Sequence, residues 1–416
     1  MKLKSKLLSS VPNPAEKRIA IRINVEAERA LRRGHPWLYA DAIKRQSHEG
    51  ESGDLAVIFD RKGRFLAIGL YDPASPIRVR VLHQGQPLPI DRDWFTMRLA
   101  EASTQRLALR GSSTSGYRLV HGENDGLPGL IIDRYGNNYV LKLYTTAWIV
   151  HLQSVLAVLF DMTGGERFIL RLSRQVQTEV DALYGLGDGT ILYGSPLITP
   201  AVFQENGLTF EADLVHGQKT GFFLDQRENR ERVERLARSQ SVLNVFAYTG
   251  GFSLYAARGG APEVVSLDMS RPALALAKRN FELNQENPAV AASRHKTMQG
   301  DAFFLLQQLA NQDRTFDMVI LDPPAFARKR DEADRALAAY DRLVRLGLGV
   351  LRRGGILVAA SCSSQVAADE FYNRINSAAA KVKRSLKEIE RTGHALDHPI
   401  GFKEGAYLKC LFARAG

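Results

Sequence analysis

The sequence predicts an α/β protein whose carboxyl-terminal half is a doubly wound, Rossmann-like sheet of parallel strands. From about residue 201 onward, short apolar runs alternate with helical patterns, which is typical of such a sheet. Paired glycines follow the first apolar run, and acidic residues follow later ones. Because ligands of doubly wound sheets bind at the carboxyl ends of the strands, these residues are the first candidates for a functional site.

The individual elements of this half follow from the same pattern. We expect strands at Val242–Phe246, Val264–Asp268, Met318–Asp322 and Ile356–Ser361. We expect helices at Phe252–Arg258, Pro272–Leu283 and Ala333–Leu351, and another that begins near Ala367. Ser270 is placed to cap the second helix, with Pro272 at its first position. A closing hairpin is expected over Ile400–Phe412, with its turn at Lys403-Glu404-Gly405.

Two smaller domains are expected before this half. Residues 19–85 contain short apolar runs separated by turn residues, as in Asp54–Phe59 and Phe65–Leu70, and predict a β-rich domain. Residues 91–199 open with a helical pattern at Asp93–Leu109 and continue with strands near Gly129–Asp133 and Tyr139–Leu143, which indicates an α+β connector. Residues 200–416 then form the third domain.

The charge balance favours a polyanionic partner. The chain has 56 Lys and Arg against 45 Asp and Glu, a net charge of +11, although many basic proteins bind no nucleic acid. The first domain carries basic residues that could line an RNA surface or simply face water: Arg22, Arg29, Arg32, Arg33, Lys44, Arg45, Arg78 and Arg80.

Other features exclude several classes of protein. We find no signal peptide and no stretch that approaches the ~18 apolar residues of a membrane span, so a cytoplasmic protein is expected. The only two cysteines, Cys362 and Cys410, are expected to be reduced thiols. His394 and His398 are four residues apart, but Pro399 and the lack of an adjoining Glu argue against a metal site.

Three segments of the third domain are candidates for binding a nucleotide-like cofactor. The glycines of Phe246-Ala247-Tyr248-Thr249-Gly250-Gly251 let the backbone pass close to a ligand before a helix begins. Asp268 then stands where a carboxylate holds ribose hydroxyls, and Asp301 where one accepts from an adenine amino group. Each feature alone could be only a tight turn or a helix cap. A nicotinamide dehydrogenase would suit the spacing, but the G-x-G-x-x-G fingerprint is absent.

The residues after the last two parallel strands indicate the reaction. Asp322-Pro323-Pro324 ends one strand with a carboxylate exposed by two stiff prolines, and Cys362 follows the next strand directly. Cys410 lies within an apolar stretch and fits the ordinary role of a buried cysteine. Carbon 5 of a pyrimidine becomes nucleophilic after a thiolate adds at carbon 6, so Cys362 is a candidate nucleophile and Asp322 a candidate for stabilising the resulting charge.

In several of these segments the chain resembles the RlmI family of bacterial 23S ribosomal RNA methyltransferases, which form 5-methylcytosine. The resemblance covers nearly the whole length. It includes Gly34-His35-Pro36-Trp37-Leu38 and Tyr71–Ser75, which look like a PUA domain, an RNA-binding β-barrel, and Tyr117–Gly129 in the centre. It is strongest in Gly217–Arg227, Phe246–Phe252, Asp322-Pro323-Pro324 and Ser361-Cys362-Ser363. One departure is Ala325, where a relative carries Lys.

The resemblance implies S-adenosylmethionine as cofactor, large-subunit ribosomal RNA as partner and Cys362 as nucleophile. It also implies that a set of residues at the carboxyl edge of the sheet and before its first strand binds the cofactor. With the segments above, this set is Lys219, Phe223, Asp225, Gln226, Arg227, Asn244, Phe246, Tyr248, Thr249, Gly250, Gly251, Asp268, Met269, Ser270, Asp301 and Ala302.

Three alternatives stay open. A 5-methyluridine synthase also uses a thiolate, but such enzymes carry Ser-Cys-Asn-Pro, whereas Ser363-Ser364 follows Cys362 here. A purine nitrogen methyltransferase would need no thiolate, and a non-catalytic RNA-binding assembly factor would retain only the fold. The target nucleotide, the form of the RNA substrate, the base that removes the carbon 5 proton and the oligomeric state, with a homodimer as one option, are not specified by the sequence.

Overall fold

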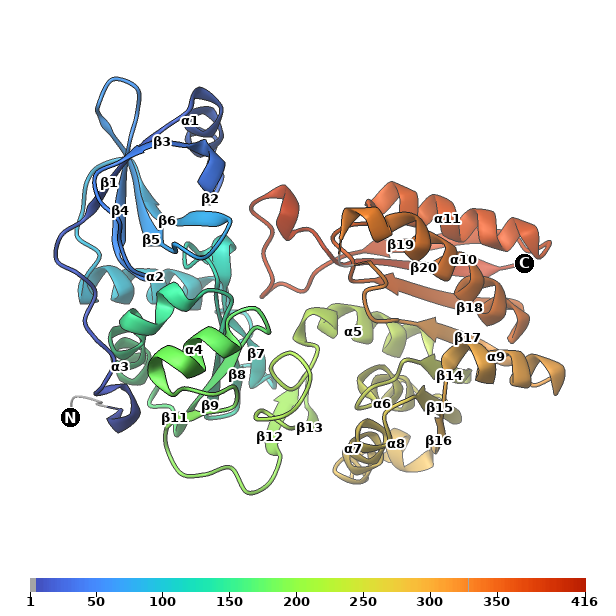
Figure 1. Cartoon of the computed structure of the whole chain (residues 1–416). Helices are drawn as coiled ribbons and strands as arrows, with labels where there is room; N and C mark the ends of the chain where they lie inside the picture. The colour runs from blue at the N-terminus through green and yellow to red at the C-terminus, as the bar shows by residue number, and fades with distance from the viewer. Residues whose placement is uncertain (1–4, 328) are drawn as a thin grey trace. The chain divides into compact units, whose positions relative to one another are not determined.

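The chain divides into two compact units. The computed structural model describes residues 5–327 and 329–416 (Figure 1). The first unit runs to Gly207 and also includes Ala212–Phe222, and the second comprises Leu208–Glu211 and Phe223–Gly416.

The first unit begins with a curled six-stranded sheet. Its strands are β1 (Ile19–Ile23), β2 (Trp37–Tyr39), β3 (Ile43–Gln46), β4 (Leu55–Phe59), β5 (Phe65–Tyr71) and β6 (Ile77–Gln84), in the order β2-β6-β5-β4-β1-β3. In β1 the isoleucines point inward and the alternate residues are exposed, as a half-buried strand requires. The predicted β-rich domain is therefore confirmed, although the sequence analysis missed helix α1 (Val25–Arg32), which Asn24 caps.

A second sheet follows in the same unit. Its five strands are β7 (Gly116–His121), β8 (Leu130–Tyr135), β9 (Asn138–Leu143), β10 (Arg167–Leu172) and β11 (Ile191–Tyr193), in the order β11-β10-β9-β8-β7. Three helices accompany it: α2 (Arg92–Gln105), α3 (Leu152–Thr163) and α4 (Gln177–Tyr184). The first helix and the two predicted strands are confirmed, with ends that differ by a few residues.

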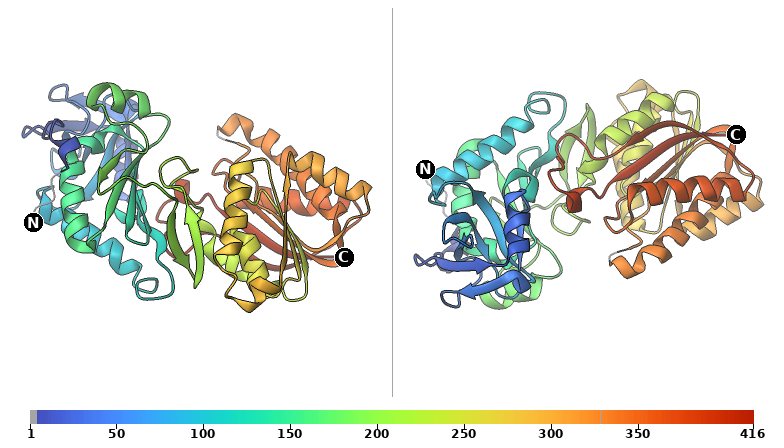
Figure 2. Two further views of the ribbon diagram at one scale, coloured as in Figure 1. Left: turned by 90° about the horizontal axis from the view of Figure 1, so that it is seen from below. Right: turned by 90° about the horizontal axis from the view of Figure 1, so that it is seen from above.

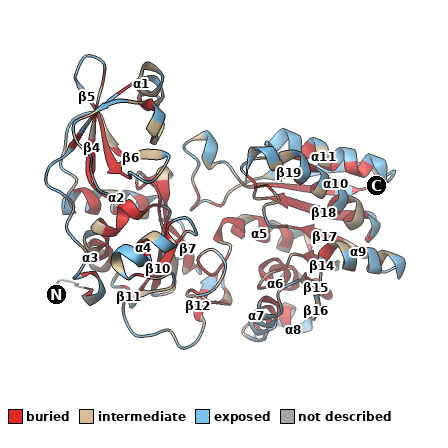
Figure 3. Cartoon of the chain, in the orientation of Figure 1, coloured by how far each residue is buried: buried red, intermediate tan, exposed pale blue. Residues whose placement is uncertain are grey.

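One stretch of this segment has the length and composition of a membrane span, contrary to the expectation from sequence. It is the 18-residue helical stretch Thr146–Thr163, which joins a 3₁₀ helix (Thr146–His151) to α3. Within the protein, 61% of it is buried, and Leu152, Val155 and Leu156 are inaccessible parts of the core. Helix α3 carries both buried and exposed residues, and Figure 3 colours each residue by its burial. Its apolar character is that of a core helix.

The two sheets of the first unit share a hydrophobic core. Ile68 and Leu70 of β5 belong to the same buried cluster as Trp148 and Leu156. Arg80 lies where these segments meet, 6% exposed, with its Nη1 3.6 Å from Asp72 Oδ2. The expectation that Arg80 could line an RNA surface is therefore wrong, because its side chain is buried and forms an ion pair with Asp72 inside the unit.

The second unit contains the predicted doubly wound sheet. Its strands are β14 (Ser241–Val245), β15 (Glu263–Asp268), β16 (Arg294–Gln299), β17 (Phe316–Leu321), β18 (Leu351–Ser361), β19 (Leu386–Thr392) and β20 (Lys409–Ala415). Their order is β16-β15-β14-β17-β18-β20-β19, parallel up to β18 and antiparallel in the last two pairings. The hairpin of β12 (Ala201–Glu205) and β13 (Leu208–Ala212) precedes it.

Helices cover both faces of this sheet (Figure 2). They are α5 (Arg227–Leu236), α6 (Gly251–Arg258), α7 (Arg271–Glu282), α8 (Pro288–Ala292), α9 (Ala302–Asn311), α10 (Ala333–Gly349) and α11 (Ala368–Lys381). Leu306 of α9, Tyr340 of α10 and Phe371 of α11 pack in one cluster with Leu243 and Val245 of β14. Ser270 caps α7 as predicted, but the helix begins at Arg271, so Pro272 is its second residue.

The predicted closing hairpin is wrong in its extent. The antiparallel partner of β20 is β19, and Lys403–Gly405 form a single 3₁₀ turn within the long connection between them. Strand β19 was not predicted because its sequence, LKEIERT, is largely exposed and has no apolar alternation.

We predict that Asp125→Ala destabilises the first unit by about 3–5 kcal/mol, because the buried Arg106 would lose its partner. Arg106 donates to both carboxylate oxygens of Asp125 at 2.8 and 2.7 Å, and both side chains are at most 1% exposed. The matched control is Asp161→Ala, whose ion pair with Arg92 is half exposed and should contribute less than about 1 kcal/mol. Urea denaturation measures both, and equal losses would contradict the argument.

Candidate active site

The candidate site lies where the order of the sheet reverses. Strand β14 has β15 on one side and β17 on the other, so successive strands depart from it in opposite directions. Val245 pairs with both Leu267 and Leu321, and Leu321 pairs with Ala359 of β18. The loops that follow these strands therefore start at one edge, at the topological switch point where such sheets bind ligands.

The loop after β14 has an unusual backbone. Phe246, Tyr248 and Gly250 have positive φ values of 62°, 48° and 77°, and two of these residues are not glycine. Left-handed conformations of non-glycine residues cost about 1 kcal/mol or more and persist where the surroundings fix them. Here the Tyr248 amide donates to Asp268 Oδ2 at 2.8 Å.

Asp268 joins this loop to the next strand end. Its second oxygen, Oδ1, accepts from the Ser270 amide at 2.8 Å, whereas the cap of α7 is the Ser270 hydroxyl. Asp268 is therefore not merely a helix cap, and its half-buried carboxylate is held at the switch point by two backbone donors. Met269, which lies between Asp268 and Ser270 in the sequence, is 65% exposed.

Two residues of this region carry buried polar atoms that suit a polar ligand. Among the described residues, Thr249 Oγ1 and Asn244 Oδ1 have no hydrogen-bond partner, although both residues are at most 1% exposed. A buried polar atom without a partner costs about 1–3 kcal/mol. Asn244 also donates to Ser253 at 2.9 Å, beneath the loop. The Thr249 hydroxyl and the Asp268 carboxylate, a hydrogen-bond acceptor, thus fit a nucleoside with hydroxyl groups.

Asp301 has the alternative role that the sequence analysis considered. Its Oδ1 accepts from the Phe304 amide at 2.9 Å and caps α9, while the residue itself is exposed. Ala302, the next residue, is buried in the first turn.

The segment before α5 approaches the site through two side chains. The Phe223 ring packs edge to face on Tyr248, with the ring centres 5.2 Å apart. Gln226 is 2% exposed and donates from Nε2 to Asp322 Oδ1 at 3.0 Å. Its Oε1 accepts from Asn229 at 2.6 Å, which fixes the orientation of the amide.

The other predicted residues of this segment make contacts elsewhere. Arg227 is 2% exposed and donates to both oxygens of Asp397, at 2.9 and 3.1 Å. Burial would raise the pKa of Asp397, but His398 and Arg227 hold it well below its ordinary value. Asp225 accepts from the Tyr407 hydroxyl at 2.9 Å. Both residues tie α5 and its preceding turn to the connection between β19 and β20.

Lys219 belongs to the first unit. It has a φ of 53°, and its carbonyl accepts from Lys142 Nζ at 3.1 Å. Burial lowers the pKa of Lys142 to about 8. The role of Lys219 in cofactor binding stays a prediction.

Cys362 stands between two inward-pointing serines. Ser361 bonds the Tyr340 hydroxyl at 2.8 Å, and the Ser363 hydroxyl donates to the carbonyl of Ala327 at 3.1 Å. Both serines are at most 1% exposed, whereas Cys362 is only half-buried, with Sγ 3.9 Å from the carbonyl of Pro323. As expected, Cys362 follows β18, which pairs with β17, and Asp322 comes directly after β17.

Cys410 is in a different environment. It lies in β20 opposite Ala360, is inaccessible to solvent, and burial raises the pKa of its thiol well above the ordinary value. Its expected role as a buried apolar residue agrees with this position.

One further residue of this region, Lys409, was not predicted from the sequence. Lys409 begins β20, is 6% exposed, and donates from Nζ to the carbonyls of Ser363 and Val366 at 2.5 and 2.8 Å. The available signal was a single lysine in the apolar stretch Tyr407–Phe412.

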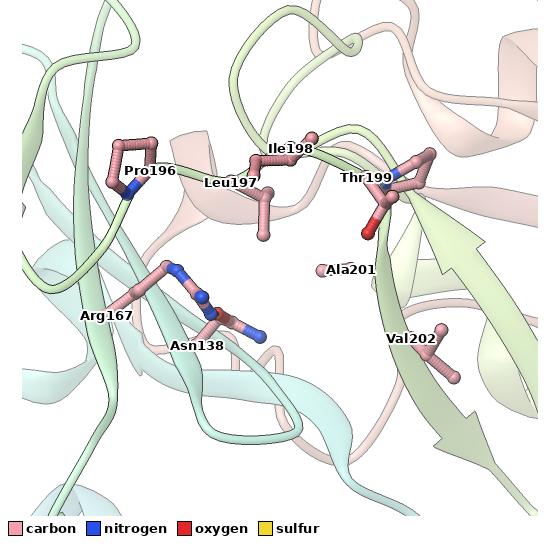
Figure 4. A pocket seen from close by; sticks show the side chains of 9 residues that line it. Asn138, Arg167, Pro196, Leu197, Ile198, Thr199, Ala201 and Val202 are labelled. Carbon is pink, nitrogen blue, oxygen red and sulfur yellow. The ribbon is translucent and has the colours of Figure 1, made fainter.

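A separate pocket of about 550 Å³ lies in the first unit (Figure 4). It is lined by Asn138, Arg167 and residues 196–202. None of the predicted site residues lines it, so we do not assign the reaction to it.

Comparison with known proteins identifies the family. A family model described as S-adenosylmethionine-dependent methyltransferase matches residues 152–414, and a PUA-like domain model matches residues 21–84. A protein of Deinococcus radiodurans named Ribosomal RNA large subunit methyltransferase is 48% identical, over 97% of this chain and 99% of the relative. The chain belongs to the family of ribosomal RNA large subunit methyltransferases.

Other relatives agree with this family. Ribosomal RNA large subunit methyltransferase I of Shewanella amazonensis is 38% identical over 95% of this chain and 99% of the relative. The predicted resemblance to the RlmI family and the predicted cofactor, S-adenosylmethionine, are thus confirmed. A methyltransferase crystallised with SAH has the same fold, with a TM-score of 0.81 at 23% identity over 95% of this chain and 99% of that one.

We predict that Gly250→Ala destabilises the second unit more than Gly354→Ala does. Both glycines have a φ of 77°, but an added Cβ at Gly250 would lie 2.9 Å from the Ala277 Cβ, whereas Gly354 has open space around it. The shared φ strain should cost about 1 kcal/mol. The extra loss at Gly250, about 1–3 kcal/mol, reports the close approach of the loop to α7. Thermal and urea denaturation test this, and equal losses would contradict it.

Proposed function

We propose that this methyltransferase forms 5-methylcytosine in large-subunit ribosomal RNA, with Cys362 as the nucleophile. The observation that carries the proposal is the placement of Cys362. It is the half-buried member of Ser361-Cys362-Ser363, at the same edge of the sheet as Asp322 and the loop after β14. A thiol presented in this way suits a reaction that needs covalent addition to the base.

The reaction can be written for the residues of this chain. The Cys362 thiolate forms a bond to carbon 6 of cytosine, and the electron pair of the 5,6 double bond makes carbon 5 nucleophilic. When bound, S-adenosylmethionine supplies the electrophilic methyl group. Loss of the carbon 5 proton to a base then restores the double bond and expels the Cys362 thiolate. The base is not assigned.

Asp322 is the group proposed to assist the addition. A carboxyl group beside ring nitrogen 3 can share a proton with it and so stabilise the charge that develops as the thiolate adds. Gln226 donates to one Asp322 oxygen. This contact supports a fixed orientation of the Asp322 carboxylate.

The substrate follows from the relatives and the charge. The curated relatives are named for the ribosomal RNA large subunit, and the chain has a net charge of +11. In the PUA-like domain Arg22, Arg29, Arg33, Lys44 and Arg45 are exposed, which supports contact with phosphates. An enzyme that acts on ribosomal RNA would work in the cytoplasm.

The alternatives make different use of Cys362. A purine nitrogen methyltransferase or a non-catalytic assembly factor gives no reason for a half-buried thiol beside Asp322. A 5-methyluridine synthase would use the same addition, so the product must be identified chemically.

We predict that large-subunit RNA containing 5-fluorocytidine traps the enzyme as a denaturation-resistant complex that requires S-adenosylmethionine. Fluorine at carbon 5 cannot leave as a proton does, so elimination stops after methyl transfer. Peptide mass spectrometry should map the adduct to Cys362.

Two variants control this experiment. Cys362→Ala should form no complex but still bind cofactor, and Cys410→Ala should behave as the wild type apart from a packing loss. An adduct on Cys410, or cytosine methylation by Cys362→Ala, would exclude the proposed nucleophile. Trapping by 5-fluorouridine in place of 5-fluorocytidine would favour the 5-methyluridine alternative.

The cofactor role of Asp268 is tested separately. We expect Asp268→Ala to weaken binding of S-adenosylhomocysteine by about 2 kcal/mol, because hydrogen bonds to a charged acceptor contribute about 1.5–3 kcal/mol. The matched control is Asp317→Ala. Asp317 also accepts a backbone amide, from Ser241 at 2.9 Å, but at the opposite end of β17. Calorimetry should show a loss only for Asp268, and unchanged affinity in the folded variant would refute the assignment.

A further inference from the structure

We propose that Lys409 is a positioning residue that clamps the turn after Cys362 and places a positive charge near its thiol. The proposal rests on the proposed function in so far as Cys362 is the nucleophile. It adds a residue from β20, a strand that carries none of the predicted cofactor or catalytic residues.

The clamp is a pair of hydrogen bonds from one ammonium group. Lys409 lies opposite Ser361 in the antiparallel pairing of β18 and β20, so its side chain starts one residue from Cys362. Its Nζ donates to the carbonyls of Ser363 and Val366 at 2.5 and 2.8 Å. These two carbonyls are the ends of the turn that leaves β18, and one donor group holds both.

Burying the ammonium group of Lys409 costs free energy unless its charge is compensated. Lys409 is 6% exposed, and lysines are rarely buried unless their charge is compensated. Among the described residues no carboxylate forms an ion pair with Lys409, and the two carbonyls that accept from it are neutral. An anion formed beside it therefore gains from its charge, and the thiolate of Cys362 is such an anion.

The turn is held on its other side as well. The Ser363 hydroxyl donates to Ala327, and the Ser363 amide donates to Ser361 Oγ at 3.3 Å. Together with the Lys409 contacts, these bonds fix the backbone on both sides of Cys362 while its thiol stays half-exposed.

Three titratable groups surround the thiol from different elements. Asp322 follows β17, and a negative charge on its carboxyl group would oppose formation of the thiolate. Tyr340, on α10, interacts electrostatically with both Cys362 and Asp322, and burial raises its pKa, so it is neutral. Lys409, on β20, has an attractive interaction with Cys362.

The charge of Lys409 sets a pH limit. Burial lowers the pKa of Lys409 to about 8, while Cys362 opposes this shift. Below this pH the lysine is charged and supports the thiolate. As the pH rises through about 8 the charge is lost, and with it the support.

The test is the pH dependence of thiol alkylation in the full-length protein without RNA. The protein has two cysteines, so a Cys410→Ala background leaves Cys362 as the only thiol. Iodoacetamide alkylation of Lys409→Met in this background should follow a titration shifted upward by about one pH unit. At a fixed pH below the thiol pKa this is about a tenfold slower reaction. Lys409→Arg should restore much of the shift.

Two further variants separate charge from packing. Lys409→Gln keeps a hydrogen-bond donor without the charge, and it serves if Lys409→Met does not fold. Ser363→Ala removes the contact with Ala327 but leaves the charge, so it should lower kcat without moving the alkylation curve. Cofactor binding by calorimetry confirms that each variant is folded.

The outcomes are distinct. Identical alkylation curves for the wild type and the folded Lys409→Gln or Lys409→Met variants would overturn the proposal. Methylation of RNA by Cys362→Ala would instead overturn the proposed function. The two failures can be told apart because the alkylation curve is measured without RNA.

Discussion

The parallel pairing of β14, β17 and β18 is the constraint on which the rest of the site depends. Their register places Val245, Leu321 and Ala359 side by side. Beyond this common level the three strands end at different points: β14 at Val245, β17 at Leu321 and β18 at Ser361. Strand β17 ends at Leu321 and two prolines follow Asp322, whereas β18 continues to Ser361, directly before Cys362. Because β18 extends further than β17, Cys362 Sγ lies 3.9 Å from the carbonyl oxygen of Pro323.

At this edge of the sheet, hydrogen bonds hold strained backbone and polar side chains in place. The loop after β14 holds two non-glycine residues in the left-handed region, and Asp268 accepts from one of their amides. Asp322 is held by the Gln226 amide, and the turn after Cys362 by Lys409. Each group expected to meet a ligand is thus oriented by a neighbour from another element, as preorganised sites require.

The sequence was most informative where a pattern is local. Apolar strands followed by glycine, proline or acidic residues predicted four strands of the second unit and the positions of Cys362 and Asp322. It was silent where stability comes from distant partners. Exposed β19 has no apolar alternation, and the buried Arg80 looks like a surface charge until its partner Asp72 is seen. Lys409 is the same case, because its acceptors are backbone carbonyls that no sequence pattern reveals.

The position of Lys409 in chain order also bears on folding during synthesis. Its contact with Ser363 spans 46 residues, and β20 enters the sheet between β18 and β19, both of which precede it. Strands β14 to β18 can therefore pair on the ribosome before the lysine has been added. Until then the turn after Cys362 lacks its clamp and the thiol lacks its neighbouring cation. A growing chain would carry the Cys362 thiol without this cation, and would gain the contacts of Lys409 only once β20 had been inserted.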